Sequence, residues 1–396
     1  MHSPVLTTVF QPIVDLTTRR PAAYEALTRV QGAGGDAFPF ELLEAAQADG
    51  RIAEFDGACW RSAFGSATAA GLTTPHALFV NVEAESLRGG LLVQVASPAP
   101  IVLEVTERAL LASPGGLLAV IEEARRAGHA IAIDDLGTDP ASLALLPLID
   151  PDVIKIDMRI IQGHADTDAA RIMSTVNTLT AARDVVVVAE GIETEEHLLT
   201  ARAIGATHGQ GWLLGRPSPV VPAAPSASLL RHVVEPAADE AGAGTPFEIV
   251  ASVLPSRRSS RDLLLQMSHF LEARARASGD SAILLSTFQQ GSNLTPRTAV
   301  RYAALAEECA LVFAFAAGAP DSLSPAIRVQ EIDDDEPLAA EWDVVVLTAD
   351  FAATLVAREV DPARHAAGLY DFVLTHDRGL AVDVARHLLQ RTTRSA

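Results

Sequence analysis

The chain of 396 residues carries 50 acidic and 30 basic side chains, which gives a formal net charge of -20 at pH 7. Because nucleic-acid polymers and anionic membrane surfaces are bound through cationic patches, this balance argues against both as general partners. The length exceeds one ordinary core and 49% of the residues are hydrophobic, so we expect two globular domains.

Cysteine usage and the N-terminus indicate a cytoplasmic protein. Cys59 and Cys309 are too few for a disulfide framework or a cysteine-rich zinc site, which fits a reducing compartment. The N-terminus lacks a basic region followed by an apolar core, and no run approaches the roughly 18 apolar residues of a membrane span. We therefore expect neither a signal peptide nor a membrane span.

Short β-rich apolar runs alternate with longer helical segments over the first 217 residues. Alternation at intervals of roughly 20 to 35 residues is typical of parallel βαβ units, so we predict an α/β fold, a TIM-like (β/α) barrel. Helices are expected over Leu117 to Ala127 and Asp168 to Arg183. The predicted strands are Thr7 to Val14, Ala22 to Leu27, Ala77 to Val82, Ile101 to Val105, Ala130 to Ile133, Val153 to Ile156 and Val185 to Ala189.

Most of these predicted strands contain or lead directly into a polar residue capable of chemistry. In a (β/α) barrel, the carboxyl ends of the strands and the loops that follow them build the active site. We therefore expect one shared site that contains Glu25, Asn81, Glu104, Asp134 with Asp135, Lys155 and Glu190.

The carboxylates of this set predict a metal centre. Four converging carboxylates cannot all stay ionised without cations, and carboxylate and amide oxygens suit hard ions such as Mg²⁺ or Mn²⁺. Two such ions about 3.5 to 4 Å apart can generate hydroxide and hold a phosphodiester for in-line attack. The adjacent Asp134 and Asp135 are the expected place for the second ion.

Each residue also has a simpler explanation when it is taken alone. The acidic residues could be solvated strand ends, Asp134 and Asp135 could form a capped turn, and Asn81 could form a turn. Lys155 and Asp157 could form a surface ion pair. The order of the whole set along the strand ends favours the functional interpretation.

A second, smaller α/β domain is expected after a linker. Residues 221–245 are rich in proline, alanine and glycine, with a short helix possible at Ala227 to Val234, so the domains are predicted at residues 1–220 and 246–396. Strands are predicted there at Glu248 to Val253, Ile283 to Phe288, Ile327 to Ile332, Val344 to Leu347 and Phe372 to Leu374. Helices are predicted at Arg261 to Ser278, Thr298 to Phe315, Phe351 to Arg358 and Ala381 to Arg391.

Eight short motifs lie between about residues 8 and 217. They are Phe10-Gln11-Pro12-Ile13, Glu25-Ala26-Leu27-Thr28-Arg29, Phe79-Val80-Asn81-Val82, Glu104-Val105-Thr106-Glu107, Asp134-Asp135-Leu136-Gly137-Thr138, Ile154-Lys155-Ile156-Asp157, Ala189-Glu190-Gly191-Ile192-Glu193-Thr194 and Gln210-Gly211-Trp212. In sequence and in order these motifs resemble the EAL family of cyclic-di-GMP phosphodiesterases. The resemblance implies metal-dependent hydrolysis of cyclic-di-GMP to linear pGpG.

The resemblance also implies roles for individual residues. The first metal would be held by Glu25, Asn81, Glu104 and Asp134, and the second by Asp134 and Asp135. Lys155 would contact the nucleophilic water with Asp157 close by, Glu190 would act as a general base or assist the metals, and Glu107 would anchor the loop after the aspartate pair. The positions that resemble the family's substrate and other site contacts are Gln11, Leu27, Arg29, Gln210 and Glu193.

The loop after the aspartate pair departs from the family's Asp-Asp-Phe-Gly-Thr-Gly pattern. Leu136 replaces Phe, Asp139 replaces the second Gly, and Pro140-Ala141 replaces an aromatic residue and a serine. In the family this loop contributes to dimerisation and control, so a homodimer is a modest expectation. A catalytically weak or silent cyclic-di-GMP receptor is the alternative to an enzyme, and an interaction scaffold is a third, more remote one.

Four further segments lie within residues 246–396. They are Ser268-His269-Phe270-Leu271-Glu272, Thr295-Pro296-Arg297-Thr298, Glu341-Trp342-Asp343-Val344-Val345-Val346-Leu347 and Tyr370-Asp371-Phe372-Val373-Leu374-Thr375-His376-Asp377-Arg378. These segments resemble the DICT domain, a sensory module found with diguanylate cyclases, phosphodiesterases and transcription regulators. This implies that an unknown ligand or protein controls the barrel. His269 and His376 could contact such a ligand, although a structural histidine is the commoner case.

Overall fold

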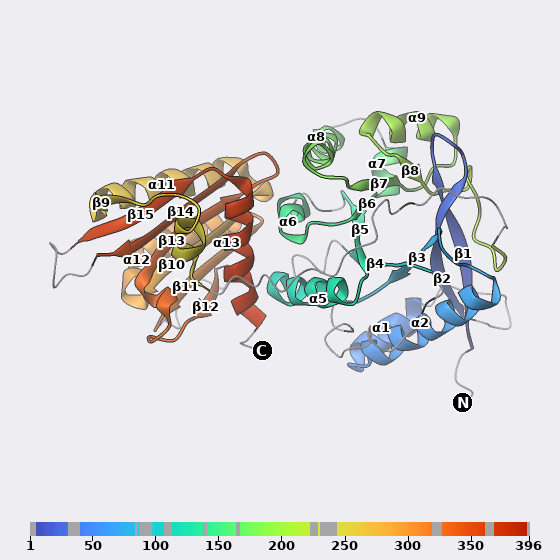
Figure 1. Cartoon of the computed structure of the whole chain (residues 1–396), viewed down its shortest axis with the longest axis horizontal. Coiled ribbons are helices and arrows are strands. Elements are labelled where there is room, and N and C mark those ends of the chain that lie inside the picture. Colours follow the sequence, from blue (N-terminus) through green and yellow to red (C-terminus); the bar gives the residue numbers. More distant parts are fainter. Residues whose placement is uncertain are drawn as a thin grey trace. The chain divides into compact units, whose positions relative to one another are not determined.

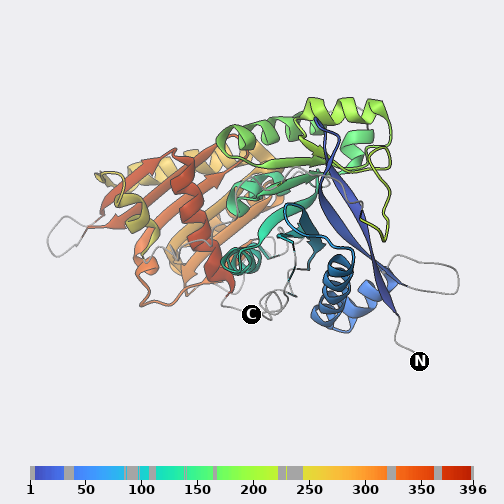
Figure 2. The ribbon, with the colours of Figure 1, turned by 45° about the vertical axis from the view of Figure 1, so that its right-hand side comes forward.

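The computed structural model describes most of the chain as two compact units, the first mainly before residue 239 and the second mainly after it (Figure 1, Figure 2). The predicted domain limits of 1–220, 221–245 and 246–396 stay predictions. None of the described helices combines the length and apolar character needed to cross a membrane. The described residues are 5–30, 40–83, 86, 97, 99–106, 113–137, 139, 141–163, 167–221, 229, 244–318, 327–360 and 368–393.

The first unit contains a closed barrel whose strands follow one another in chain order, which confirms the predicted fold. Each of the predicted strands is present, and β8 was missed because it is only two residues long. The strands are β1 (Leu6–Asp15), β2 (Pro21–Val30), β3 (Ala77–Asn81), β4 (Ile101–Thr106), β5 (Ala130–Leu136), β6 (Val153–Ile156), β7 (Val186–Ala189) and β8 (His208–Gly209).

The expectation of parallel strands throughout was wrong at one place. β1 runs antiparallel to both β2 and β8, whereas the other neighbours run parallel. Only residues 16–20 connect β1 to β2, which is too short for the crossover that a parallel pair needs. The carboxylate of Asp15 closes this hairpin turn by accepting hydrogen bonds from the backbone N–H groups of Thr17 and Thr18.

Helices surround the barrel strands (Figure 1). The predicted helices at 117–127 and 168–183 correspond to α5 and α8. α9 has clear boundaries: the Thr194 hydroxyl accepts from His197 N at its start, and Gly205 adopts a left-handed conformation at its end. The helices are α1 (Phe40–Ala48), α2 (Ile52–Ala69), α5 (Pro114–Arg126), α7 (Met158–Gln162), α8 (Thr167–Ala182) and α9 (Glu195–Ile204). The start of α5 and the whole of α6 (Ser142–Ile149) group with the second unit.

The second unit is a mixed seven-stranded sheet in the order β12-β11-β10-β13-β14-β15-β9. Its strands are β9 (Arg257–Ser260), β10 (Ile283–Gln290), β11 (Leu311–Ala317), β12 (Arg328–Glu331), β13 (Glu341–Leu347), β14 (Ala352–Glu359) and β15 (Leu369–Thr375). Its α-helices are α10 (Pro246–Ala251), α11 (Arg261–Ser278), α12 (Pro296–Glu308) and α13 (Arg378–Gln390). Short 3-10 turns are η2 (Gly279–Ser281), η3 (Gly291–Asn293), η4 (Pro337–Ala340) and η5 (Arg391–Thr393).

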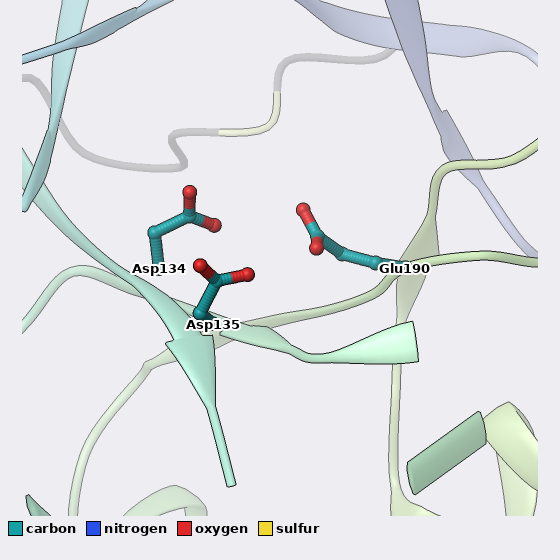
Figure 3. A group of neighbouring side chains, drawn as sticks. All are labelled: Asp134, Asp135 and Glu190. Atoms are coloured by element: carbon teal, nitrogen blue, oxygen red, sulfur yellow. The ribbon is translucent and has the colours of Figure 1, made fainter. Parts of the chain in front are cut away.

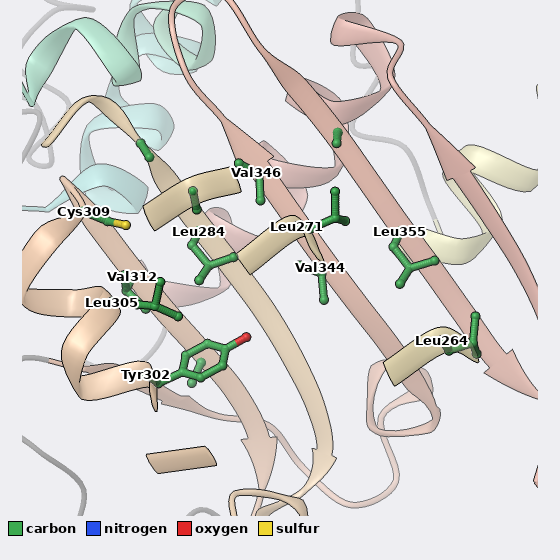
Figure 4. Packing of buried hydrophobic residues seen from close by; sticks show 14 of the residues in the cluster. Leu264, Leu271, Leu284, Tyr302, Leu305, Cys309, Val312, Val344, Val346 and Leu355 are labelled. Atoms are coloured by element: carbon green, nitrogen blue, oxygen red, sulfur yellow. The ribbon is translucent and has the colours of Figure 1, made fainter. Parts of the chain in front are cut away.

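The core of this sheet lies under α11 and α12. Leu264 and Leu271 of α11 and Tyr302 of α12 pack against Leu284 and Val344 of the central strands (Figure 4). α10 and α13 contact β13 and β14 and contribute their own buried apolar residues. The sheet is thus buried by helices, which gives the smaller α/β architecture that the sequence predicted.

Three predicted elements of the second unit were wrong. The strand at 248–253 is mostly α10, because Thr245, Pro246 and Glu248 form a capping box with proline in the first turn. The segment predicted as a helix at 351–358 is strand β14. In the segment predicted as a helix at 298–315, the helix α12 ends at Glu308 and strand β11 begins at Leu311. Both strands are buried over nearly their whole length, so they lack the alternation that marks a half-exposed strand. The short helix predicted at 227–234 lies outside the described residues, apart from Leu229.

Candidate metal centre and active site

The site residues follow interior side chains of the barrel with a spacing of two. A buried cluster inside the barrel includes Ala23, Phe79, Val102, Ala132, Val153 and Val188. Because strand side chains alternate between two faces, the residue two positions later faces the interior as well. In the same order these residues are Glu25, Asn81, Glu104, Asp134, Lys155 and Glu190. The strand period therefore brings all six to one end of the barrel.

The ammonium group of Lys155 lies at the centre of this set. Its Nζ is 2.6 Å from Glu104 Oε1, 2.7 Å from Glu190 Oε1, 2.8 Å from Asp134 Oδ1 and 3.6 Å from Glu25 Oε2. Lys155 is 1% exposed and Glu104 is 0% exposed. One positive charge therefore faces four carboxylates where water is largely excluded, and the centre keeps an excess of negative charge.

Amide side chains orient the carboxylate of Glu25. Gln210 Nε2 donates to Glu25 Oε2 over 2.6 Å, and Asn81 Nδ2 donates to Glu25 Oε1 over 3.3 Å. Gln11 lies opposite Glu25 in the β1–β2 ladder, and its Nε2 donates to the carbonyl of Gly215 over 3.4 Å. Gln210 therefore contacts a predicted metal ligand directly.

The aspartate pair breaks the normal alternation of β5. Asp135 has a left-handed backbone with φ of 57°, and the β5–β6 register shifts between Ile133 and Leu136. Figure 3 shows the carboxyl groups of Asp134 and Asp135 side by side, with that of Glu190 facing them. Oxygens of these three residues lie within 4.8 Å of one another. An unbroken strand would instead direct two successive side chains to opposite faces.

Burial and mutual repulsion shift the pKa values of this centre. Burial, together with Asp134 and Glu25, raises the pKa of Glu190 to about 8, although Lys155 opposes the shift. Burial and the charge of Glu25 raise the pKa of Glu104 well above its usual value. Burial alone would lower the pKa of Lys155, but the carboxylates outweigh burial and raise it well above its usual range. Protonated carboxyl groups of this kind release protons when a cation binds.

Glu104 tests directly whether the site fits a metal. Its Oε2 is buried and, among the described parts of the chain, accepts no hydrogen bond. A buried carboxylate oxygen without a partner is costly unless a ligand satisfies it. With the oxygens of Asp134, Asp135 and Glu190 close by, the donor set is all oxygen and strongly anionic. These residues fit hard divalent ions such as Mg²⁺ or Mn²⁺.

The predicted substrate contacts do not all reach the same place. Leu27 and Arg29 line a cavity of about 330 Å³ that Asn81 also borders. The Arg29 guanidinium donates to the carbonyl of Thr28 over 2.9 Å. Glu193 is exposed, and its backbone N–H donates to His197 Nδ1 over 3.3 Å. Within the described residues, the Glu193 side chain is not among the carboxylates that surround Lys155.

Asp157 has a clear local role. It caps α7 by accepting from Arg159 N over 2.7 Å, and its Oδ1 also lies 2.9 Å from Arg159 Nε. The alternative of a surface ion pair between Lys155 and Asp157 was wrong, because Lys155 is buried and pairs with other carboxylates. Burial, with the charges of Asp134 and Asp157, raises the pKa of Asp135 to about 6. Glu107 lies outside the described residues.

Two positioning features were missed in the sequence. Trp60, a buried residue of α2, donates from Nε1 to the carbonyl of Asn81 over 2.9 Å and fixes the end of β3. Gly191 has φ of +67°, and a Cβ there would lie 2.4 Å from the Cβ of Met158. Glycine therefore lets the chain turn directly after Glu190. A lone tryptophan and a common glycine carry too little signal to be assigned without the fold.

The altered loop after the aspartate pair is locally satisfied. Leu136 is fully buried and pairs with Ile156 in the β5–β6 ladder. Asp139 Oδ1 accepts from Ala141 N over 2.9 Å, and its carbonyl accepts from the Ser142 hydroxyl over 2.8 Å. The replacement of glycine by Asp139 thus supplies turn contacts that glycine lacks. Thr138 and Pro140 lie outside the described residues.

Comparison with known proteins follows the same division of the chain. The EAL domain family model matches residues 2–217. The model of the DICT domain, described as a sensory domain in diguanylate cyclases and two-component systems, matches residues 249–360.

Two curated relatives illustrate the match. The bifunctional diguanylate cyclase/cyclic di-GMP phosphodiesterase MucR of Pseudomonas aeruginosa is 36% identical over 136 residues, which cover 34% of this chain and 20% of MucR. The Escherichia coli K12 protein named "Probable cyclic di-GMP phosphodiesterase PdeB" is 31% identical over 222 residues, which cover 53% of this chain and 42% of PdeB. The chain thus spans less than half the length of either relative.

Solved structures also resemble the chain. A c-di-GMP complex of the PaMucR phosphodiesterase has a TM-score of 0.47 and 30% identity, and the match covers 54% of this chain and 92% of that one. A manganese and cy-diGMP complex of Klebsiella pneumoniae BlrP1 has a TM-score of 0.48 and 28% identity, with 55% and 57% covered. From the family matches, the chain belongs to the EAL domain family, and its second unit contains a DICT sensory domain.

Proposed function

We propose that the barrel is a metal-dependent phosphodiesterase that hydrolyses cyclic-di-GMP to linear pGpG. The observation that carries this proposal is the convergence of Glu25, Glu104, Asp134 and Glu190 around Lys155 Nζ, within 2.6 to 3.6 Å. The names of the relatives MucR and PdeB support the choice of substrate. A purely structural ion pair would not need four carboxylates and a partnerless buried oxygen.

Two divalent ions, Mg²⁺ or Mn²⁺, would activate a water molecule and offset the charge of the phosphodiester. We assign Glu25, Asn81, Glu104 and Asp134 to the first ion, and Asp134 and Asp135 to the second. Glu190 faces the aspartate pair and is placed either to complete the metal coordination or to accept a proton. Each of the four carboxylates around Lys155 Nζ thus has a proposed role.

The remaining residues orient these groups and the substrate. Lys155 stays protonated, so it limits repulsion among the carboxylates and can donate a hydrogen bond to the attacking water. Gln210 holds Glu25 in place, and Asp157 fixes the turn into α7 behind Asp135. We assign Arg29, Leu27 and Gln11 to the nucleotide, since a guanidinium suits phosphate and the first two line a cavity beside Asn81.

We also propose that the second unit regulates this activity through its own ligand or partner protein. The support is the match to the DICT sensory domain over residues 249–360. A regulatory domain of this kind changes the rate of hydrolysis without supplying catalytic groups. Its effect should therefore appear in the turnover of cyclic-di-GMP rather than in the metal content of the protein.

The test is a turnover assay on the full chain with Mg²⁺ or Mn²⁺, in which pGpG is separated by ion-exchange chromatography. We expect pGpG to form with at least one ion, to disappear with EDTA, and to fall sharply in Glu25→Ala. Asp152→Asn is the matched control, because Asp152 Oδ2 accepts from Ile131 N near the amino ends of β5 and β6, at the opposite end of these strands.

Two outcomes would contradict the proposal. If the wild type binds cyclic-di-GMP without turnover, the chain is a receptor, as the altered loop at residues 136–141 would allow. If neither binding nor pGpG is detected, and wild type and Glu25→Ala behave alike, the carboxylate cluster has another role.

A further inference from the structure

The second unit contains a cavity whose lining includes none of the residues assigned to the proposed metal centre. It has a volume of about 350 Å³ and is bordered by α11, β10, α12 and β13. We call it the arginine-rimmed cavity, after its lining residues Arg261, Arg297 and Arg301. Its volume is at the small end of the roughly 300 to 1,000 Å³ typical of ligand pockets, so one compact molecule would fill it.

The charge of the lining is opposite to that of the chain. Glu272 is the single carboxylate among the lining residues, whereas three arginines border the same space. Glu272 is neutralised locally: its Oε2 lies 2.6 Å from Arg301 Nε, and Tyr302 lies 3.1 Å from its Oε1. Arg261 and Arg297 then remain as cationic groups of a cavity in a protein of net charge -20. A cationic pocket in an acidic protein favours an anion.

The floor of the cavity is buried and polar. Tyr302 is 1% exposed and its hydroxyl lies 2.7 Å from Ser286 Oγ and 3.1 Å from Glu272 Oε1. A tyrosine has one proton to give, so the chain of hydrogen bonds runs from Ser286 through Tyr302 to Glu272. This fixed network holds Glu272 and Arg301 in place and keeps the carboxylate from repelling an anion.

The walls are aromatic and rigid. Trp342 packs edge-on against Tyr370 with ring centroids 6.0 Å apart, and Phe288 packs edge-on against Tyr302 at 5.0 Å. Both Trp342 and Phe288 line the cavity. Flat apolar walls of this kind suit a planar apolar group of a ligand, because such a group can stack on the rings and has no flexible chain to immobilise.

The backbone is irregular at the same place. The β10–β11 register shifts between Thr287 and Gln290, and Gln289 has a left-handed φ of 58°. Successive residues from Ser286 to Gln289 border the cavity as a result, which regular alternation would prevent. A left-handed backbone conformation at a residue other than glycine costs conformational free energy, and such residues cluster at binding sites and active sites.

We propose that the arginine-rimmed cavity binds a small organic anion with a planar apolar body, such as an aromatic carboxylate. The anionic group lies toward Arg261 and Arg297, and the planar body lies between Trp342 and Phe288. The sequence allowed a ligand contact at His269 or His376, with a structural histidine as the commoner case. We assign the contact to His269, which lines the cavity, whereas His376 Nδ1 lies 3.1 Å from the carbonyl of Ala352.

The test is calorimetric titration of the full chain in EDTA, which keeps metal from recruiting phosphate to the barrel. The probes are 2-naphthoate, its neutral amide 2-naphthamide, phenyl phosphate and inorganic phosphate. We expect 2-naphthoate or phenyl phosphate to bind, the amide to bind at least about tenfold more weakly, and inorganic phosphate to bind more weakly than phenyl phosphate. Carboxylate and phosphate ligands are distinguished by which of the two aromatic anions binds more tightly.

Exposed arginines allow matched variants that should fold normally. Arg297→Gln and Arg261→Gln each remove one charge from the rim and should weaken binding about tenfold. Arg274→Gln removes an exposed arginine of α11 that packs over Phe351, outside the cavity, and should leave binding unchanged.

Three results would overturn the proposal. The first would be that no aromatic anion binds to correctly folded protein with a Kd below about 1 mM. The second would be that the amide binds as tightly as the naphthoate, or inorganic phosphate as tightly as phenyl phosphate. The third would be that Arg274→Gln weakens binding as much as the rim variants, which would indicate general electrostatic attraction.

Discussion

The two units of this protein bury carboxylates in opposite ways. In the barrel, Glu25, Glu104, Asp134 and Glu190 converge on one lysine, and Glu104 Oε2 has no described hydrogen-bond donor. In the second unit, Glu341 of β13 is buried as completely, but its two oxygens accept from the Thr245 hydroxyl and from Phe247 N.

The contrast separates a carboxylate that is satisfied within the chain from a group of carboxylates that crowd one another. Glu341 stabilises the start of α10 and has a donor for each oxygen. Its neighbour Asp343 accepts from Thr287 over 3.1 Å, and burial with the charge of Glu341 raises the pKa of Asp343 well above its usual value. Asp343 Oδ1, like Glu104 Oε2, is buried without a hydrogen-bond partner among the described residues. The convergence of four carboxylates on one lysine, rather than burial or a single partnerless oxygen, is therefore what distinguishes the proposed metal centre.

Removal of a converging carboxylate should have the largest effect. Glu104→Gln keeps the shape of the side chain but removes one metal-binding charge, so we expect kcat for cyclic-di-GMP to fall about 10³-fold. Asp152→Asn should change kcat less than twofold. Turnover and metal content, measured on both variants, check this prediction. Similar kcat values in Glu104→Gln and Asp152→Asn would mean that the converging carboxylates are no more important for turnover than a carboxylate elsewhere in the barrel.

Lys155→Met should destabilise the metal-free barrel by about 3 to 5 kcal/mol, because it leaves buried carboxylates without their cation. Added Mn²⁺ should restore more stability to the variant than to the wild type. Urea unfolding with and without Mn²⁺ measures this. Arg276→Met is the control, since its pair with Glu308 is at the surface and its loss should hardly change the free energy of unfolding. Equal responses to Mn²⁺ would contradict a cation site beside Lys155.

Asp56 of α2 is a buried carboxylate outside the proposed metal centre and predicts a pH effect on stability. Burial raises its pKa from 3.8 to about 6, although the hydrogen bond from Glu83 N opposes the shift. The unfolded chain then loses this proton before the folded chain does. Stability should therefore fall by about 3 kcal/mol in total as the pH rises from well below 4 to well above 6.

Asp56→Asn cannot ionise and should lack this decline. The free energies of unfolding of wild type and variant, measured at pH 4.5 and pH 7.5 in EDTA, give the comparison. Parallel pH profiles would mean that Asp56 titrates normally.

The smallest effect concerns the satisfied carboxylate. Thr245→Ala removes the N-cap of α10 and the hydroxyl that donates to Glu341, so it should cost about 1 to 2 kcal/mol. Thr245→Ser keeps the hydroxyl and should cost much less. Thermal unfolding of the second unit distinguishes the two. Equal losses would point to the methyl group of the threonine instead of its hydrogen bonds.

The sequence predicted the barrel strands well because each is a short β-rich apolar run, which is a local property, and side chains within a strand have a period of two. The same period carried each interior apolar residue to a site residue two positions later, as with Val102 and Glu104. The hydrogen-bond partners of the site residues were not predictable. Gln210 donates to Glu25, which is 185 residues away in the chain, and Asp157 accepts from Arg159. In the second unit, strands buried on both faces lost the period, and β14 was mistaken for a helix.

The sequence offered His269 as a possible ligand contact, but it did not predict the arginine-rimmed cavity. Its cationic rim combines Arg261, Arg297 and Arg301 from two helices, and its walls come from two strands. Residues of this kind are ordinary surface or core residues in their own segments. Only the packing of α11 and α12 on the sheet brings them to one space.

The left-handed backbone of Asp135 limits how this site can change during evolution or design. Aspartate, asparagine and glycine tolerate that conformation, whereas most residues would pay about 1 to 2 kcal/mol there. A histidine or cysteine that would shift the centre toward zinc therefore starts at a disadvantage at residue 135. Loss of the proposed second ion by Asp135→Asn or Asp135→Gly would be the mutational route of least strain, so a silent descendant of this barrel should arise at this position before it arises at Glu104.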